Sequence, residues 1–241
     1  MRRQVPFLEP GTPLPDPRAA GRAGLVAVGG DLRPGTLLDA YSKGIFPWYD
    51  REPVLWHSPD PRMVLLPSDL RVSRSLRRTI KRGTFDVRLD TVFERVIRSC
   101  AEVPRRGERG TWITPAMIEA YCRLHDMGYA HSAESYRDGA LAGGLYGVSL
   151  GAAFFAESMF TREDDASKVA LVALVTQIRA WGFQIFDCQV HTDHAARFGA
   201  TEWPRDRFLR ALATALREPG RRGRWARDAG GGMPAPREAG D

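Results

Sequence analysis

The segment FDCQVHTD, residues 186–193, places a carboxylate, a thiol and an amide side by side after an apolar run. Read as a strand, it alternates its side chains between two faces. Asp187 and Gln189 then share one face, and Cys188 shares the other with apolar neighbours. We therefore expect Cys188 to pack as a small hydrophobe. The alternative is a nucleophilic thiol, although no histidine is fixed on its own face.

Asp187 and Gln189 are the leading candidates for chemistry in this segment. The strand follows residues 166–181, whose apolar side chains cover more than one helical face and predict a deeply packed helix. The strand should therefore be central in its sheet, where a carboxylate is costly unless it is paired. We interpret the two side chains as the lining of a polar cleft, and a solvent-facing strand surface is the alternative.

Glu157 is a second acid in an apolar setting, within FFAESMF. Alternation predicts that Phe155, Glu157 and Met159 share one face of a strand, although a bulge could re-aim any of them. An acid among large apolar residues suits recognition of a cationic group. A capping or salt-bridge role is the alternative.

Metal chemistry is not expected from the histidines or the cysteines. His191 and His194 flank Asp193 in a loop after a strand, without the i, i+4 spacing of metalloprotease helices. Such residues more often form turns and caps. The three cysteines are widely separated, so neither a disulfide framework nor a CxxC metal site is indicated.

Two features are compatible with a nucleic-acid partner. The run LRVSRSLRRTIKR, residues 70–82, carries six basic residues and no acid, and four of the six share one face of a predicted helix. A merely solvated helix face is the alternative. Trp48 and Trp112 follow loop-forming residues and can stack on a base, with core packing as the alternative.

Charge and composition set broad limits. The net charge of +6 favours a polyanionic partner without establishing one. No apolar run approaches the roughly 18 residues that span a bilayer, so we expect a cytoplasmic protein with no membrane contact.

The pattern of elements predicts an α+β protein with two lobes. We expect a small N-terminal α/β domain with an extended arm over residues 1–68, a catalytic domain over 69–216 and a disordered tail over 217–241. In the larger domain, Asp138-Gly139 predicts a hairpin turn, followed by a further strand, the buried helix, the strand with FDCQV and a last helix. The same order occurs in GNAT-type acyltransferases.

The motifs GLVAVGGDL, AYSKGIFPWY, LWHSPDPR, RVSRSL, GTWIT, AHSAESY, GGLYGV, FFAESMF, ASK and DCQV occur in this order. Together they closely resemble the leucyl/phenylalanyl-tRNA protein transferases over roughly residues 24–216. The resemblance implies a small N-terminal domain and a larger GNAT-like domain with a mixed sheet flanked by helices. It implies transfer of leucine or phenylalanine, less readily methionine, from aminoacyl-tRNA to the N-terminal Arg or Lys of a protein, which marks that protein for degradation.

The resemblance also implies roles for individual residues. Asp187 would orient the acceptor amine and help to deprotonate it, and Gln189 would position the ester, without metal or cofactor. Glu157 would read the cationic N-terminal residue. Trp48 and Trp112 would hold the terminal adenosine of the tRNA. The acceptor stem would contact the basic residues Arg74, Lys81 and Arg82. The amino-acid side chain would enter an apolar pocket formed by Leu145, Phe154, Met159, Leu171, Ile178 and Phe186.

Two other functions stay open at this point. A coenzyme A dependent N-acyltransferase would need the RxxGxG/A pyrophosphate loop, and residues 161–168, TREDDASK, carry three acids instead. A non-catalytic RNA-binding factor fits the charge and the tryptophans but leaves a buried Asp187 and Gln189 unexplained.

Overall fold

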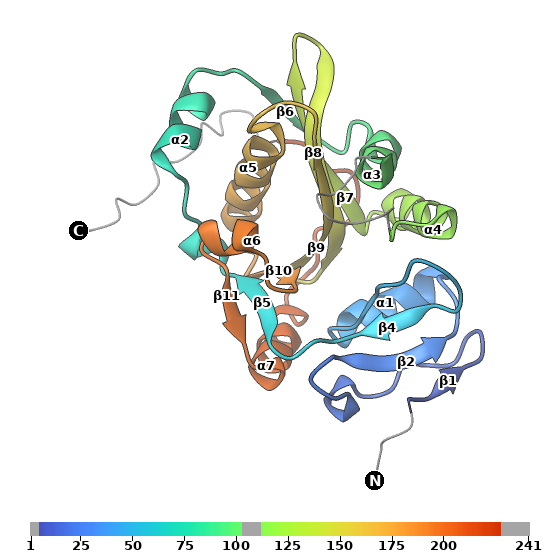
Figure 1. Ribbon diagram of the computed structural model, residues 1–241. Coiled ribbons are helices and arrows are strands. Elements are labelled where there is room, and N and C mark those ends of the chain that lie inside the picture. The colour runs from blue at the N-terminus through green and yellow to red at the C-terminus, as the bar shows by residue number, and fades with distance from the viewer. Residues whose placement is uncertain (1–4, 103–111, 228–241) are drawn as a thin grey trace.

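Two sheets organise the chain, and they differ in size. The computed structural model describes residues 5–102 and 112–227. Its smaller sheet has the strand order β1-β2-β4-β3, and its larger, seven-stranded sheet has the order β11-β5-β10-β9-β8-β7-β6. Figure 1 shows the smaller sheet at the N-terminal end, packed beside the larger one.

The small lobe consists of short strands around one helix. Its elements are β1 (Phe7–Leu8), β2 (Leu25–Gly29), α1 (Pro34–Ser42), β3 (Phe46–Pro47) and β4 (Leu55–His57). Helix α1 begins at Pro34, whose missing N–H costs nothing in a first turn. Gly44 follows with φ of +68°, and an added Cβ would lie 2.7 Å from the ring of Phe208. This glycine therefore lets the small lobe approach the last helix closely.

The large sheet is antiparallel except at one pair. Its strands are β5 (Arg62–Leu65), β6 (Asp86–Leu89), β7 (Ala130–Arg137), β8 (Ala140–Leu150), β9 (Ala153–Thr161), β10 (Ile185–Gln189) and β11 (Thr201–Trp203). Strands β9 and β10 run parallel. The predicted hairpin between β7 and β8 is confirmed, and Asp138 and Gly139 both have positive φ, as a two-residue hairpin turn requires.

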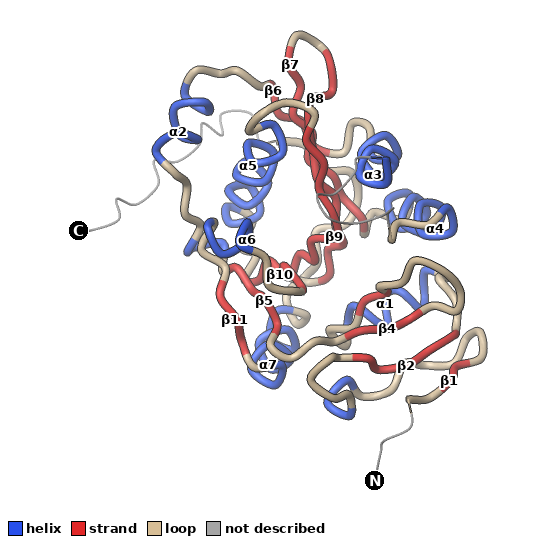
Figure 2. Tube along the Cα trace, in the orientation of Figure 1, coloured by secondary structure: helices blue, strands red, loops and turns tan. Residues whose placement is uncertain are grey.

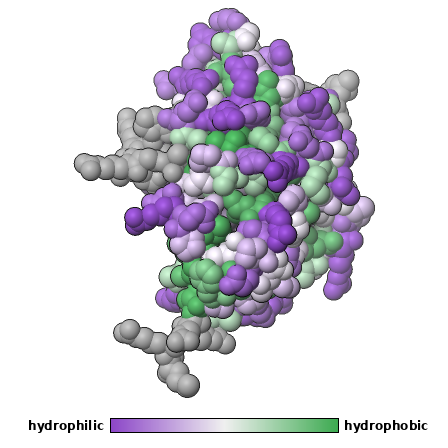
Figure 3. Space-filling model, turned by 90° about the vertical axis from the view of Figure 1, so that its right-hand side faces the viewer, coloured by the Kyte–Doolittle hydropathy of each residue, from purple (hydrophilic) through white to green (hydrophobic). Residues whose placement is uncertain are grey.

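Helices cover both faces of the large sheet, as Figure 2 shows. They are α2 (Arg74–Lys81), α3 (Phe93–Glu102), α4 (Pro115–Asp126), α5 (Ala166–Ala180), α6 (Asp193–Arg197) and α7 (Arg205–Ala215). Helix α5 lies on one face, and α3 and α4 lie on the other. In Figure 3, hydrophobic side chains reach the surface in patches between hydrophilic ones.

Two apolar clusters fill the two sides of the sheet. The lobe-side cluster joins the small lobe, α3, α4 and α7, and includes Trp56, Phe155 and Phe208. The α5-side cluster lies between α5 and the sheet, and includes Phe154 and Phe186. The deep packing predicted for residues 166–181 is confirmed, because most side chains of α5 are buried.

The predicted α+β class with a small N-terminal and a larger C-terminal domain is confirmed. The predicted boundary at residue 68 is wrong, because β5 pairs with β10 and β11 in the large sheet. The predicted disorder after residue 216 is also wrong as far as Arg227, since Trp225 is only 2% exposed. The rest of that predicted tail lies outside the described residues. Within the described ranges, no helix is long and apolar enough to cross a membrane.

Candidate active site at the end of the parallel strand pair

The parallel pairing of β9 and β10 is short and stops where the polar side chains begin. It joins Ile185 to Ala153, Phe186 to Phe154 and Asp187 to Phe155. The pairing of β10 with its other neighbour, β5, shows a register shift between Asp187 and Gln189 of β10, and Gln189 has φ of +64°. Strand β10 is therefore irregular just beyond the last paired residue. We call the place where the pairing of β9 and β10 ends the opening of the sheet.

Asp187 is paired with a buried arginine that the sequence interpretation did not include. Arg62 Nε donates to Asp187 Oδ1 at 2.8 Å, and Arg62 Nη2 donates to Oδ2 at 2.6 Å. Both side chains have no exposed surface. The backbone N–H of Gln189 also donates to Asp187 Oδ1, at 2.9 Å. A bidentate ion pair and a main-chain hydrogen bond thus fix the orientation of this carboxylate.

Arg62 is held in turn by both lobes. Its Nη1 donates to the carbonyl oxygen of Gly44 at 3.1 Å. Its guanidinium carbon lies 4.8 Å from the ring centroid of Phe46 and 4.6 Å from that of Phe208. These contacts fix the orientation of the guanidinium and, through it, the carboxylate of Asp187.

Glu157 lies across the opening from Gln189 and is bonded to it. Gln189 Nε2 donates to Glu157 Oε1 at 2.7 Å. Tyr41 Oη lies 2.7 Å from the same oxygen, Tyr121 Oη lies 3.1 Å from Oε2, and the two hydroxyl oxygens are also within hydrogen-bond distance of each other. Each hydroxyl has one proton, so the two protons are shared among these three contacts. Burial raises the pKa of both tyrosines well above the ordinary value, so they remain protonated donors.

When Glu157 is ionised, no cationic side chain of the described residues balances its charge. Burial raises the pKa of Glu157 to about 7, and nearby Asp187 adds to the rise, while the hydrogen bonds from Tyr41, Tyr121 and Gln189 oppose it. Arg62 already neutralises Asp187. Among the described residues no cationic side chain forms an ion pair with Glu157. Its ionised form therefore favours an incoming cation.

A bulge decides which residues Glu157 shares its face with. In the pairing of β8 with β9, Tyr146 faces Ser158 and the next residue of β8 faces Ala156, so Glu157 is the extra residue. Phe155 and Glu157 both turn to the lobe side, but Met159 packs in the α5-side cluster. The predicted common face for all three is therefore wrong for Met159, because the bulge reverses the alternation beyond Glu157.

Cys188 lies on the opposite side from Asp187. It is partly buried against the α5-side cluster, and burial raises the pKa of its thiol well above the ordinary value. A thiol in that condition is not activated for attack, because the thiolate is the nucleophile.

One apolar cluster contains all six residues that were expected to form the pocket for the side chain of the transferred amino acid. All lie in the α5-side cluster, on strands β8, β9 and β10 and on helix α5: Leu145, Phe154, Met159, Leu171, Ile178 and Phe186. Ala156 and Cys188, which directly follow the last paired residues of β9 and β10, are partly exposed members of this cluster. The cluster therefore meets the surface where the two strands separate.

The two tryptophans come from different lobes. Trp48 is 44% exposed, and its ring lies edge-on to His57 at 5.7 Å. Trp112 is partly buried against the lobe-side cluster. Trp48 thus offers an exposed ring surface, whereas Trp112 offers less.

The basic residues of α2 lie apart from this network. Helix α2 packs against α5 on the side away from the small lobe (Figure 1). Three exposed cations lie on and next to this helix: Arg74, Lys81 and Arg82. None of them forms an ion pair within the described part of the chain. Elsewhere in the described ranges, no cluster of three His, Cys, Asp or Glu side chains could hold a metal ion.

The sequence comparisons decide the family. The family model for leucyl/phenylalanyl-tRNA protein transferases matches residues 64–213, and the model for the N-terminal domain of the same family matches residues 30–60. The chain belongs to the leucyl/phenylalanyl-tRNA protein transferase family. A leucyl/phenylalanyl-tRNA–protein transferase of Myxococcus xanthus (strain DK1622) is 61% identical over 217 residues, which are 90% of this chain and 93% of the relative. One of Anaeromyxobacter dehalogenans (strain 2CP-C) is 60% identical over 219 residues, covering 90% and 94%.

In this member of the transferase family, the structure adds three residues to those expected from the sequence. Arg62 bonds to Asp187, and Tyr41 and Tyr121 bond to Glu157. Tyr41 lies in the motif AYSKGIFPWY and Arg62 in LWHSPDPR, so both were within recognised motifs. No local pattern indicated their partners, which are 116 and 125 residues away.

Proposed function

We propose that this chain transfers leucine or phenylalanine from aminoacyl-tRNA to the α-amino group of a protein that begins with Arg or Lys. The acceptor nitrogen forms an amide bond with the aminoacyl carbonyl carbon, and the ester bond to the tRNA ribose breaks. The nitrogen loses a proton, and the ribose hydroxyl gains one. Because the ester is already activated, the reaction needs neither a metal nor a cofactor.

The observation that carries this proposal is the hydrogen bond between Gln189 and Glu157 across the opening of the sheet. It places an oriented amide and a buried acid beside the partly exposed end of an apolar cluster. An amino acid with an apolar side chain and a peptide with a cationic end can meet there. Holding two reactants in register is itself a large source of rate enhancement.

Gln189 is the residue proposed to contact the attacking amine. Its Nε2 is committed to Glu157, and its Oε1 has no donor within the described residues. The amide oxygen can therefore accept a hydrogen bond from the α-amino group and aim its lone pair. Asp187 has both oxygens bonded to Arg62, with a further bond from the main chain of Gln189. We assign Asp187 to orienting Gln189 rather than to taking the proton.

Glu157 is proposed to select the acceptor. Its ionised carboxylate is the unbalanced charge of the buried network, so an Arg or Lys side chain or the terminal ammonium can neutralise it. An unperturbed α-amino group titrates at roughly pH 7.7–8.0. Only modest help is then needed to free its lone pair.

The donor contacts follow the family resemblance. The leucine or phenylalanine side chain would enter the α5-side cluster, and the terminal adenosine would lie on Trp48 and Trp112. The acceptor stem would contact the exposed cations of α2 and its C-terminal end. Apolar contacts discriminate one methylene by only about 1–3 kcal/mol, so methionine should be a poorer donor without being excluded. Since aminoacyl-tRNA is a cytoplasmic substrate, we place the reaction in the cytoplasm, where it would mark proteins for degradation.

A transfer assay tests the proposal. The protein is incubated with radiolabelled Leu-tRNA, Phe-tRNA or acetyl-CoA and with peptides that begin with Arg, Lys or Ala. We expect label only from the two aminoacyl-tRNAs and only on Arg or Lys peptides. Label from acetyl-CoA alone would indicate a coenzyme A dependent acyltransferase, and tRNA binding without transfer would indicate an RNA-binding factor.

The role of Asp187 is tested by substitution. Asp187→Ala should abolish transfer while tRNA binding stays near the wild-type value. Asp187→Asn, which keeps the volume and one acceptor oxygen, serves if the alanine variant does not fold around the unpaired Arg62. Full activity of a folded Asp187→Asn variant would contradict the orienting role.

A further inference from the structure

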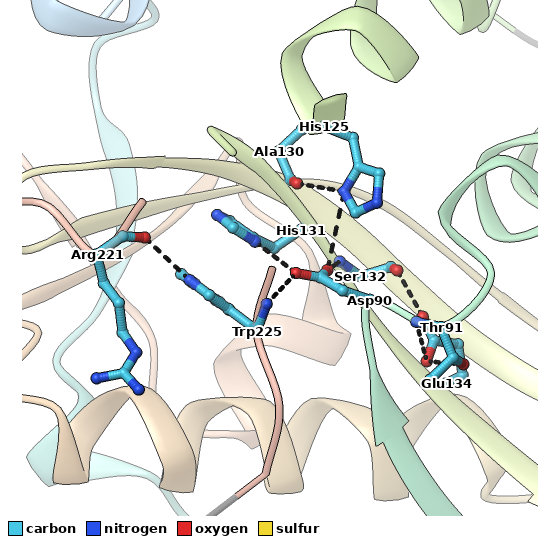
Figure 4. Close-up of polar contacts among 9 residues, drawn as sticks. All are labelled: Asp90, Thr91, His125, Ala130, His131, Ser132, Glu134, Arg221 and Trp225. Atoms are coloured by element: carbon cyan, nitrogen blue, oxygen red, sulfur yellow. Dashed lines mark hydrogen bonds and ion pairs between the residues drawn. The ribbon is translucent and has the colours of Figure 1, made fainter. Parts of the chain in front are cut away.

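The segment that follows α7 returns to the large sheet and ends in a buried tryptophan. Trp225 is 2% exposed, its backbone N–H donates to Asp90 Oδ2 at 2.7 Å, and its Nε1 donates to the carbonyl oxygen of Arg221 at 3.0 Å. Figure 4 shows its ring lying beside His131, above helix α5. The family-model match ends at residue 213, so this segment lies beyond it.

The path of the segment is fixed before it reaches Trp225. The backbone N–H of Gly223 donates to the carbonyl oxygen of Gly128 at 3.3 Å. A Cβ added at Gly128 would lie 2.3 Å from Gly223 N, so only glycine lets the segment cross here. The guanidinium of Arg222 lies 4.4 Å from the ring centroid of Tyr129. The segment is thus docked on the end of α4 and the start of β7.

Four rings surround the indole of Trp225. It stacks on His131 with centroids 3.6 Å apart and planes at 5°. Trp181 lies at 5.1 Å and Phe183 at 5.8 Å, both edge-on. Phe154 lies at 5.9 Å in a tilted arrangement. Trp225 therefore belongs to the α5-side cluster, which is the cluster proposed to receive the donor side chain.

Phe154 connects the indole to the opening between β9 and β10. On one side Phe154 stacks on Phe186 of β10 at 5.4 Å. Its ring extends over Gly147 of β8, where an added Cβ would lie 2.6 Å from the ring. Gly147 pairs in turn with His131 of β7, on which Trp225 stacks. The order across the sheet is therefore the opening, Phe154 and then Trp225.

We propose that Trp225 is the far wall of the donor side-chain pocket and sets the size of the side chain that the pocket accepts. It does so by holding the ring of Phe154 in place over β8. This inference rests on the proposed function and deepens it, because it names a specificity-determining residue in a segment to which neither the sequence pattern nor the family resemblance gave a role. Trp225 does not touch the reacting atoms.

Removal of the indole should change selectivity more than rate. In Trp225→Ala, the Phe154 ring can move into the vacated space, which deepens the pocket. Side chains larger than leucine should then gain by about tenfold in kcat/KM relative to leucine, the scale of discrimination in apolar pockets. Trp225→Phe, which keeps an aromatic wall, should stay close to the wild-type ratio.

The experiment measures kcat/KM for Leu-tRNA, Phe-tRNA and Trp-tRNA with one peptide that begins with Arg. A matched pair of shortened chains separates the wall from the rest of the segment. A chain ending at Arg227 keeps Trp225 and should behave as wild type, whereas a chain ending at Arg224 should behave as Trp225→Ala. Added indole, which can refill the space, should move the ratios of Trp225→Ala back toward wild type.

Unfolding and a failed proposal give different results. Thermal denaturation establishes that each variant is folded at the assay temperature, and Trp225→Leu replaces Trp225→Ala if the latter is not. A folded variant whose activity falls equally for all three donors, or does not change, overturns the assignment of Trp225 as the wall. If the wild-type chain transfers none of the donors, the proposed function itself fails.

Discussion

Glu157→Gln should stabilise the fold above neutral pH and remove acceptor selection at the same time. Burial raises the pKa of Glu157 from the ordinary value of 4.5 to about 7. The folded state therefore binds a proton more tightly than the unfolded chain does. The resulting stabilisation is complete below pH 4.5 and is lost as the pH rises to 7. Above pH 7 the protein carries the full cost of the buried charge.

The size of this effect follows from the pKa. A rise from 4.5 to about 7 corresponds to about 3 kcal/mol. The amide can keep the existing contacts, because its oxygen can face Tyr41 and Gln189 while its nitrogen donates to the hydroxyl of Tyr121. Neutral hydrogen bonds are weaker than charge-assisted ones, and we allow about 1 kcal/mol for that loss. The expected gain at pH 8 is about 2 kcal/mol, or about 4–8 °C in Tm.

The measurement is thermal unfolding of wild type and variant at pH 5 and pH 8, together with transfer to Arg and Lys peptides. At pH 5, where wild-type Glu157 is already protonated, the two proteins should differ little. Transfer at pH 8 should fall by tenfold or more in the variant, since the acceptor loses its counter-charge.

A second buried acid provides the matched control. Glu134 is bonded to Ser132 and Thr91, away from the site, and burial raises its pKa as well. Glu134→Gln should alter pH-dependent stability but leave transfer intact. Equal destabilisation by Glu157→Gln at both pH values, or unchanged transfer to Arg peptides, would refute the reasoning.

Three further predictions follow from single contacts. Arg62→Lys keeps the charge but loses the bidentate geometry and both ring contacts. It should destabilise the fold by about 3 kcal/mol in denaturant unfolding and sharply reduce transfer. A variant as active as wild type would contradict the functional importance of the ion pair with Asp187. Cys188→Ala should keep near-normal transfer, and loss of most activity would mean that the thiol takes part in the reaction. Alanine replacement of Arg74, Lys81 or Arg82, on and next to α2, should weaken tRNA binding without changing the rate at saturating tRNA. The salt dependence of tRNA binding should fall by about one counterion per replaced residue. The control is Arg98, which is exposed but paired with Glu94.

Local features of the fold were predictable because their causes are local. The hairpin at Asp138-Gly139 follows from two residues that tolerate positive φ. Helix α4 begins at residues that are typical of a helix start, because Thr114 accepts a hydrogen bond from Met117 N and Pro115 lies in the first turn. The separation of Cys188 from Asp187 follows from strand alternation. The bulge at Glu157 did not follow, because the extra residue is set by pairing with β8 and not by the FFAESMF segment itself.

The tail illustrates how composition misleads. Residues 217–227 are rich in arginine and glycine, a composition typical of disordered segments. Yet arginine can pack its planar head on aromatic rings, as Arg221 does on Trp181 and Arg222 on Tyr129. The burial of one tryptophan against His131 then holds the segment in place. The docking surface lies on α4, β7 and α5, far away in the sequence, so no window around the tail contains it.

The proposed active site cannot be assigned to the larger domain alone, although the family match divides near residue 60. Arg62 needs the Gly44 carbonyl and the Phe46 ring of the small lobe, and Asp187 needs Arg62. Glu157 receives one of its hydrogen bonds from Tyr41 of α1. Were the lobes to separate, the buried carboxylate of Glu157 would lose a donor and the buried guanidinium of Arg62 would lose an acceptor, and each such loss costs about 1–3 kcal/mol or more for a charged group. The small lobe is therefore held against the larger one by the same polar network that contacts Gln189, and under the proposed function the two domains act as one catalytic unit.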